Sequence, residues 1–136
     1  MGLLGKKEKT KTTIIKKKET PAELTALDAV CKDDKEVCEA LKDFMFYDPR
    51  KIKTNMEDAV ERAKEYEKDG KIHIAKMWYR VAGGLAIYKG DVAKVKLYLG
   101  KYAKLANNEP EPTILKIPEK AVKKAQEFYS KHLKQV

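Results

Sequence analysis

The sequence contains little of the chemistry on which most enzymes and metal sites depend. Its 136 residues include two cysteines, two histidines and one tryptophan. His73 and His132 are far apart in the sequence, and neither lies beside a nucleophile motif. A structural zinc site needs four closely spaced ligands, so the cysteine pair is a poor zinc site. Gly83 and Gly84 lack the GxxxxGK spacing of a phosphate loop. We therefore expect no enzyme, no cofactor and no metal.

Long apolar runs are also missing. No run approaches the roughly 18 residues that mark a membrane-spanning helix. The opening MGLL is too short for the apolar region of a secretion signal. Lys6 stands where a myristoylation signal has serine or threonine, so that signal is absent too. We expect an intracellular protein that has no integral membrane segment and is not secreted through a signal peptide.

Cys31 and Cys38 are seven residues apart, and two interpretations of the pair remain open. They are either two small buried hydrophobic side chains or a disulfide that joins two helices across a tight turn. A disulfide would be expected inside a hyperthermophile, where intracellular disulfides are common. The charged share of 38%, rich in lysine and glutamate, resembles that of proteins from hot environments.

Positive charge is concentrated at the two ends of the chain. The first 18 residues hold seven lysines, no arginine and one acid, for a net charge of +6. The last 18 residues add +3, so residues 19–118 sum to zero. Charge gathered at a terminus usually meets an anionic surface. Lysine without arginine favours point-charge attraction to phosphates over the reading of bases.

We therefore predict nucleic-acid binding that is independent of base sequence and weakened by salt. The predicted contacts are Lys6, Lys7, Lys9, Lys11, Lys16, Lys17, Lys18, Lys120, Lys123 and Lys124. One alternative is a solvated tail that only keeps the protein soluble. Another is weak, reversible attachment to a membrane surface by MGLL and the lysines. The sequence does not distinguish DNA, RNA and lipid as the anionic partner.

Helix signals follow the basic arm in close succession. They are Thr20-Pro21, Asp33-Asp34, Thr54 or Asn55, Asp69-Gly70, Gly90-Asp91 and Pro118. Apolar residues recur at helical spacing between these signals. Asp48-Pro49 should end the second helix. Ile114 and Ile117 should form a short extended piece after the acidic loop. We predict an all-α fold, a helical bundle of about five to six helices over residues 20–136, with a basic arm over residues 1–19.

The helix expected over residues 72–88 is apolar on more than one side. Such a helix is either central in its bundle or faces another subunit. Gly83-Gly84 inside it should allow close approach of a neighbouring backbone, or a kink. Most aromatic rings at helical spacing should be core, with Tyr79 and Arg80 as the exposed pair. The predicted subunit interface consists of Leu3, Leu4, Ile14, Ile15, Trp78, Tyr79, Gly83 and Gly84.

Two family resemblances bear on function. Residues 56–106 hold two helical hairpins, and Trp78 and Tyr98 resemble the aromatic positions of a tetratricopeptide repeat. Lys94 and Lys101 fall where that repeat has small residues. This resemblance implies a monomeric helical adaptor that binds a protein partner, such as a polymerase, between its hairpins.

The second resemblance covers roughly residues 54–134. A helical hairpin over 63–77, a proline-broken loop over 107–118 and a final helix containing AVKKA resemble the all-helical virion proteins of large spindle-shaped archaeal viruses, the bicaudavirus kind. The resemblance implies a viral coat subunit that assembles on or around DNA, and such proteins can also bind host RNA polymerase. The lysine arm has no counterpart in that pattern.

The main hypothesis is thus a non-enzymatic structural protein of a virion or its host cytoplasm. It would be a self-assembling coat or nucleoprotein subunit, a homo-oligomer or helical assembly, whose basic arm contacts DNA or neighbouring subunits. The adaptor is the alternative.

Overall fold

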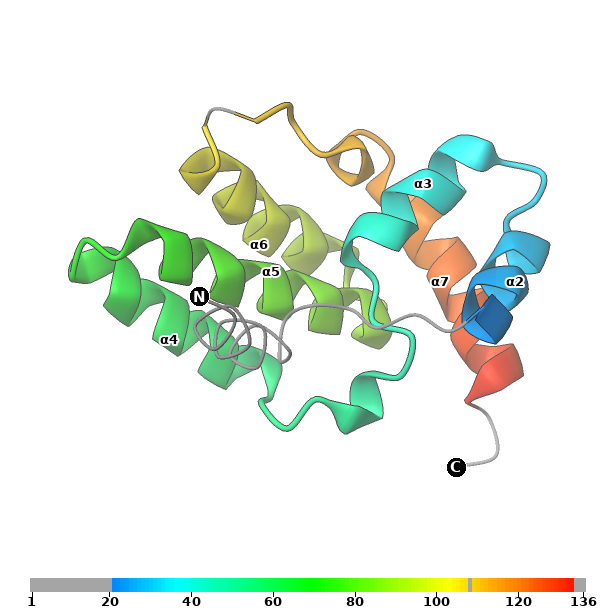
Figure 1. Ribbon diagram of the computed structural model, residues 1–136, viewed down its shortest axis with the longest axis horizontal. Coiled ribbons are helices and arrows are strands. Elements are labelled where there is room, and N and C mark those ends of the chain that lie inside the picture. The colour runs from blue at the N-terminus through cyan, green and yellow to red at the C-terminus, as the bar shows by residue number, and fades with distance from the viewer. Residues whose placement is uncertain (1–20, 108, 134–136) are drawn as a thin grey trace, which may run out of the picture.

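The computed structural model describes residues 21–107 and 109–133, and of residues 21–25 it describes the backbone alone. These residues form six α-helices and two short 3-10 helices, with no strand among them, which confirms the all-α prediction (Figure 1). The elements are α2 (Pro21–Val30), α3 (Lys35–Phe44), η1 (Pro49–Lys51), α4 (Met56–Lys68), α5 (Ile72–Lys89), α6 (Val92–Leu105), η2 (Thr113–Leu115) and α7 (Pro118–His132).

Side-chain caps begin three of the helices where the sequence predicts them. Asp34, Asn55 and Asp91 each accept a hydrogen bond from the backbone N–H three residues further on. Such caps satisfy amides that have no partner inside the helix. Gly90 ends α5 in the left-handed conformation, with a φ of 73°. The cap therefore lets the chain turn directly into α6.

Two local predictions are wrong. The second helix ends at Phe44 rather than at Asp48, because Met45 already has an extended backbone. The segment around Ile114 is a 3-10 turn and not an extended piece. Ile114 is fully buried against the core, so the turn serves to direct its side chain inward.

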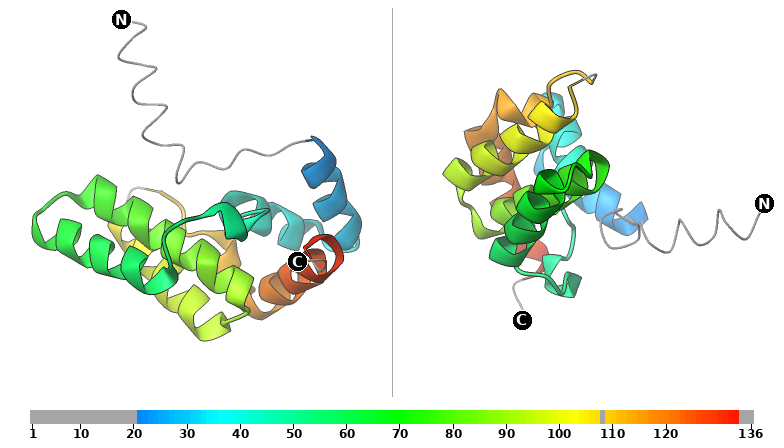
Figure 2. Two further views of the ribbon diagram at one scale, coloured as in Figure 1. Left: turned by 90° about the horizontal axis from the view of Figure 1, so that it is seen from below. Right: turned by 90° about the vertical axis from the view of Figure 1, so that its left-hand side faces the viewer.

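Helices α4, α5 and α6 form a layer with α5 in the middle. Figure 1 shows α4 and α6 on opposite sides of α5, and both pack along it extensively. Helices α2, α3 and α7 gather at the other end of the molecule, as Figure 2 shows from two further directions. One continuous core lies between these two groups of helices, and all six described α-helices contribute to it.

The several apolar sides of α5 are explained by its central position. Its second half is buried without interruption from Val81 to Ile87, between α4, α6, α3 and α7. The apolar sides of α5 are therefore explained by a central position in the chain's own bundle, and a second subunit is not needed to cover them.

Gly83 and Gly84 serve side-chain packing within this core. A Cβ atom on Gly83 would overlap the side chain of Leu99, and one on Gly84 would overlap the ring of Phe46. The α5 helix runs without a break through both residues. The glycines thus allow the side chains of Leu99 and Phe46 to approach the backbone of α5 closely. The alternative, a kink at these glycines, does not occur.

Helix α7 is tied to distant backbone by two polar side chains. The Tyr129 hydroxyl donates a 2.5 Å hydrogen bond to the carbonyl of Phe46. The Gln126 amide donates to the carbonyls of Ile87 and Tyr88, at 2.8 and 3.0 Å. Both carbonyls belong to the last turn of α5, and that of Ile87 also accepts a hydrogen bond from the backbone N–H of Gly90. The contacts fix α7 against the end of the central helix.

Candidate functional site

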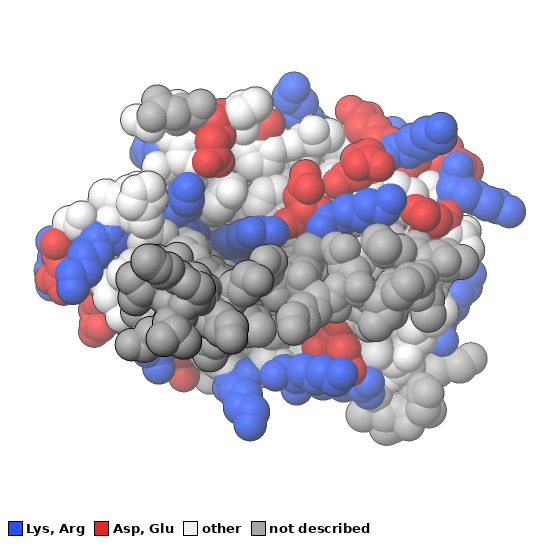
Figure 3. Space-filling view, viewed as in Figure 1, with Lys and Arg blue, Asp and Glu red and all other residues white. Residues whose placement is uncertain are grey.

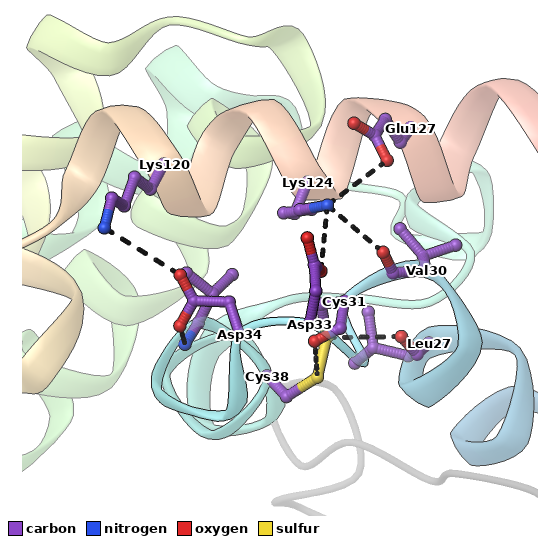
Figure 4. A network of polar contacts seen from close by, with 10 residues as sticks. Leu27, Val30, Cys31, Asp33, Asp34, Cys38, Lys120, Lys124 and Glu127 are labelled. Carbon is purple, nitrogen blue, oxygen red and sulfur yellow. Dashed lines mark hydrogen bonds and ion pairs between the residues drawn. A yellow bond between two sulfur atoms is a disulfide. The ribbon is translucent and has the colours of Figure 1, made fainter.

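The three α7 lysines predicted to bind nucleic acid have different surroundings. Lys120 forms an ion pair of 3.9 Å with Asp34, and Lys124 forms one of 3.3 Å with Asp33 (Figure 4). Lys123 is exposed. The structure therefore gives two of the three lysines a carboxylate partner within the chain, and the side chain of Lys120 stays 68% exposed.

Lys124 is the centre of this contact. Its ammonium group also donates to the carbonyl of Val30 at 3.3 Å and lies 3.8 Å from Glu127. The hydrogen bond from Lys124 is the main cause that lowers the pKa of Asp33. Lys124 therefore clamps the turn between α2 and α3 onto α7.

Cys31 and Cys38 form a disulfide beside this clamp. Both are buried, and their Cα atoms are 5.7 Å apart, a normal separation for a bridge. The disulfide joins the end of α2 to α3 across the turn that Lys124 holds. Of the two interpretations of this cysteine pair, the structure therefore shows the disulfide.

The residues predicted as a subunit interface within α5 lie mostly inside the chain's own core. Tyr79 is 1% exposed, and Gly83 and Gly84 are buried. Because neighbouring helices cover α5, these three residues present no surface to a second subunit. Trp78 is half-buried and lies under the guanidinium of Arg62, whose carbon is 5.2 Å from the ring centre.

The expectation that Tyr79 is exposed is wrong for the same reason. Its hydroxyl donates a 2.9 Å hydrogen bond to Glu67 of α4. Burial, together with this bond, raises the pKa of Tyr79 to about 12. Arg80, its predicted companion, is half-buried with its guanidinium over the ring of Phe44. The pair therefore belongs to the packing of α5 against its neighbours.

The predicted site residues of the basic arm lie outside the residues that the structure describes. These are the lysines Lys6, Lys7, Lys9, Lys11, Lys16, Lys17 and Lys18 and the apolar residues Leu3, Leu4, Ile14 and Ile15.

A basic surface that the sequence reasoning missed lies on the outer side of α6. This helix contains four lysines and no acid, and we call its outer side the lysine face (Lys94, Lys96, Leu97, Lys101 and Lys104). Leu97 is 51% exposed and is one of three large hydrophobic residues exposed among those described. On the opposite side of the helix, Val95 and Leu99 are fully buried.

Most of the lysine face is not neutralised from within the described part of the chain. Lys96 has a carboxylate 3.9 Å away, that of Glu119. Lys101 lies over the ring of Tyr79, at 5.9 Å from its centre. No described carboxylate forms an ion pair with Lys94 or Lys104. The face therefore combines free positive charge with an apolar centre.

Four residues of the lysine face also line a groove, namely Lys96, Leu97, Lys101 and Lys104. Its volume is about 560 Å³, and its lining includes the apolar or small residues Leu97, Gly100 and Ala103. A Cβ atom on Gly100 would meet nothing within 4 Å, so the groove is open at that point. Lysines line the α6 side, and the loop after α6 supplies Glu109 and Glu111. The groove therefore has lysines on one side and glutamates on the other.

A smaller hollow of about 410 Å³ lies between α3, α5 and the loop after α6. The Arg80 guanidinium, above Phe44, donates to the carbonyl of Asp43 at its edge. Tyr102 lines the hollow, and burial is the main cause that raises the pKa of its hydroxyl. Glu109 on the rim is paired with Lys76 at 3.6 Å. Arg80 and Glu109 of this hollow thus already have partners within the chain.

A metal-ligand cluster and a membrane-spanning helix are both absent from the described residues. No group of three or more histidine, cysteine, aspartate or glutamate side chains among them is placed to hold a metal ion. None of the described helices combines the length and the apolar character needed to cross a membrane.

Comparison with protein families, curated proteins and solved structures found no match to this chain.

Proposed function

We propose that this chain is a non-enzymatic structural subunit that associates with further copies of itself through the lysine face of α6. The observation that carries the proposal is Leu97, half exposed among lysines on a helix whose other side is buried. Charge of one sign gathered on one surface attracts a surface of the opposite sign, and α6 carries four lysines and no acid. The basic arm would contact DNA or a neighbouring subunit, because its seven lysines suit phosphates or acidic side chains.

The coat role is the specific form of this proposal. It rests on the resemblance to bicaudavirus-like virion proteins and on a composition typical of hot environments. The apolar sides of α5 do not support self-association, because they are buried within the chain. The lysine face of α6 is the proposed contact surface instead.

Negative-stain microscopy of the full chain tests the proposal. The protein would be imaged with and without double-stranded DNA, at low and high salt. Filaments, tubes or regular particles are the expected result, and dependence on DNA would assign the arm to packaging. Deletion of residues 1–18 should then remove the DNA dependence. Uniform small particles in every condition would contradict self-assembly, and an unchanged DNA affinity after the deletion would contradict the role of the arm.

A helical adaptor is the second candidate function. The groove along α6 favours it, because a space of about 560 Å³ with apolar or small residues in its lining can accept a segment of another protein. This function predicts a monomer at all salt concentrations, with little affinity for nucleic acid. Sedimentation of the full chain alone distinguishes it from the structural subunit.

A further inference from the structure

An acidic stripe lies on the outer side of α4. Asp58, Glu61 and Glu65 are all exposed, and their i, i+3, i+7 spacing places them on one side of the helix, with Arg62 and Lys68 exposed beside them. The opposite side of α4 is buried against α5 through Ala59 and Ala63. We call Asp58, Glu61 and Glu65 the acidic stripe.

The lysine face of α6 is opposite in charge to this stripe and similar to it in length. Lys94, Lys101 and Lys104 stand three, four and seven residues from Leu97, so they surround it on the outer side of α6. With a rise of about 1.5 Å per residue, these lysines span about 15 Å and the stripe spans about 10 Å. Lysine side chains are long enough to bridge that difference.

Between residues 21 and 105, acidic residues predominate in the earlier part and basic residues in the later part. Residues 21–71, which include α4, hold fourteen acids and ten bases, whereas residues 72–105 hold seven bases and one acid. On the face seen in Figure 3, both signs are interspersed over the α2 and α3 end of the molecule. Within the α4 to α6 layer, α4 holds five acids and three bases, whereas α6 holds four bases and no acid.

We propose that the lysine face of one copy docks on the acidic stripe of a second copy. This proposal rests on the proposed self-association and names the partner surface for it. Opposite charges on the two surfaces would steer the approach and fix the orientation of the contact. The methylene groups of Glu61 and Glu65, together with the lysine stems, would cover Leu97.

The positions of the two surfaces determine the kind of assembly. Because α4 and α6 lie on opposite sides of α5, two copies cannot form both contacts with each other at once (Figure 1). The contact is therefore heterologous, and each added copy leaves one lysine face and one acidic stripe unused. Such contacts produce rings or open filaments rather than closed dimers. Exposed ion pairs are individually weak and screened by salt, so assembly should need low ionic strength and high protein concentration.

Charge reversal on each surface provides the test. One variant carries Lys94→Glu, Lys101→Glu and Lys104→Glu, and a second carries Asp58→Lys, Glu61→Lys and Glu65→Lys. Each alone should sediment as a folded monomer at low salt, because both surfaces then carry the same sign. An equimolar mixture should assemble, since each reversed surface then meets a complementary one. Circular dichroism checks that each variant is helical.

A matched control changes the same amount of charge elsewhere. Lys35→Glu, Lys116→Glu and Lys131→Glu replace exposed lysines on α3, after η2 and on α7, and this variant should assemble as the wild type does. If the wild type assembles but the mixture of reversed variants stays monomeric, the docking of α6 on α4 is wrong while self-assembly stands. If the wild type is monomeric at low salt and high concentration, both the docking and the proposed function are wrong.

Discussion

The hydroxyl of Tyr129 in α7 donates a hydrogen bond to the carbonyl of Phe46, which precedes it by 83 residues. Both partners are buried, and burial also raises the pKa of the Tyr129 hydroxyl. The bond satisfies a carbonyl in the irregular segment between α3 and η1. It thereby connects the path of that segment to the C-terminal helix.

Tyr129→Phe should lower the free energy of unfolding by about 1–3 kcal/mol, because it leaves a buried carbonyl without its donor. Urea denaturation followed by circular dichroism measures the change. Tyr98→Phe is the matched control, since Tyr98 is half-buried and its hydroxyl has no described hydrogen-bond partner. Equal stability of the two variants would show that the Tyr129 bond contributes nothing.

Gly83→Ala should destabilise the protein even though alanine is the better helix former. The new methyl group overlaps the buried side chain of Leu99, and overpacking of this kind costs about 1–3 kcal/mol. Gly100→Ala in α6 adds the same atom into open space, so it should instead gain up to about 1 kcal/mol in helix propensity. Thermal melts of the two variants should therefore shift in opposite directions.

Reduction of the Cys31–Cys38 disulfide should lower the free energy of unfolding by about 2–3 kcal/mol, as expected for closure of a loop of this short length. Denaturation with and without a reducing agent gives the value. A double variant, Cys31→Ser with Cys38→Ser, should show the lower stability in both conditions. If the reducing agent destabilised the double variant as well, its effect on the wild type would not come from this bond.

Lys124→Met should reduce the sensitivity of stability to acid. Lys124 lowers the pKa of Asp33 in the folded protein below its ordinary value of 3.8. This contribution is present above pH 3.8 and is lost as the pH falls through the lowered folded pKa. Between pH 5 and pH 3, the variant should thus lose less stability than the wild type does. Lys123→Met removes an exposed lysine one residue away and should follow the wild-type curve.

Much of the fold could be predicted because local signals and tertiary packing agree. Asp34, Asn55 and Asp91 cap their helices as expected, and Gly90 supplies the turn that its position indicates. The sequence is less informative where tertiary packing determines the backbone conformation. Ile114 resembles part of an extended segment, but the core selects a 3-10 turn that buries its side chain.

The site was harder to predict, because it depends on charges that are distant in sequence. The partners of Lys120 and Lys124 are Asp34 and Asp33, about 90 residues earlier, and no local pattern shows that they meet. The net charge of zero over residues 19–118 concealed the lysine face of α6, since acid-rich helices earlier in the chain cancel it. Charge summed helix by helix would have found it.

Sedimentation velocity of the full chain tests self-association most directly. The protein would be compared at about 20 mM and about 0.5 M salt over a wide range of protein concentrations, because exposed charge pairs are strongly screened at the higher value. The account predicts a sedimentation coefficient that rises with concentration at low salt and returns to that of a monomer at high salt. A monomer at every concentration and both salt levels would contradict it.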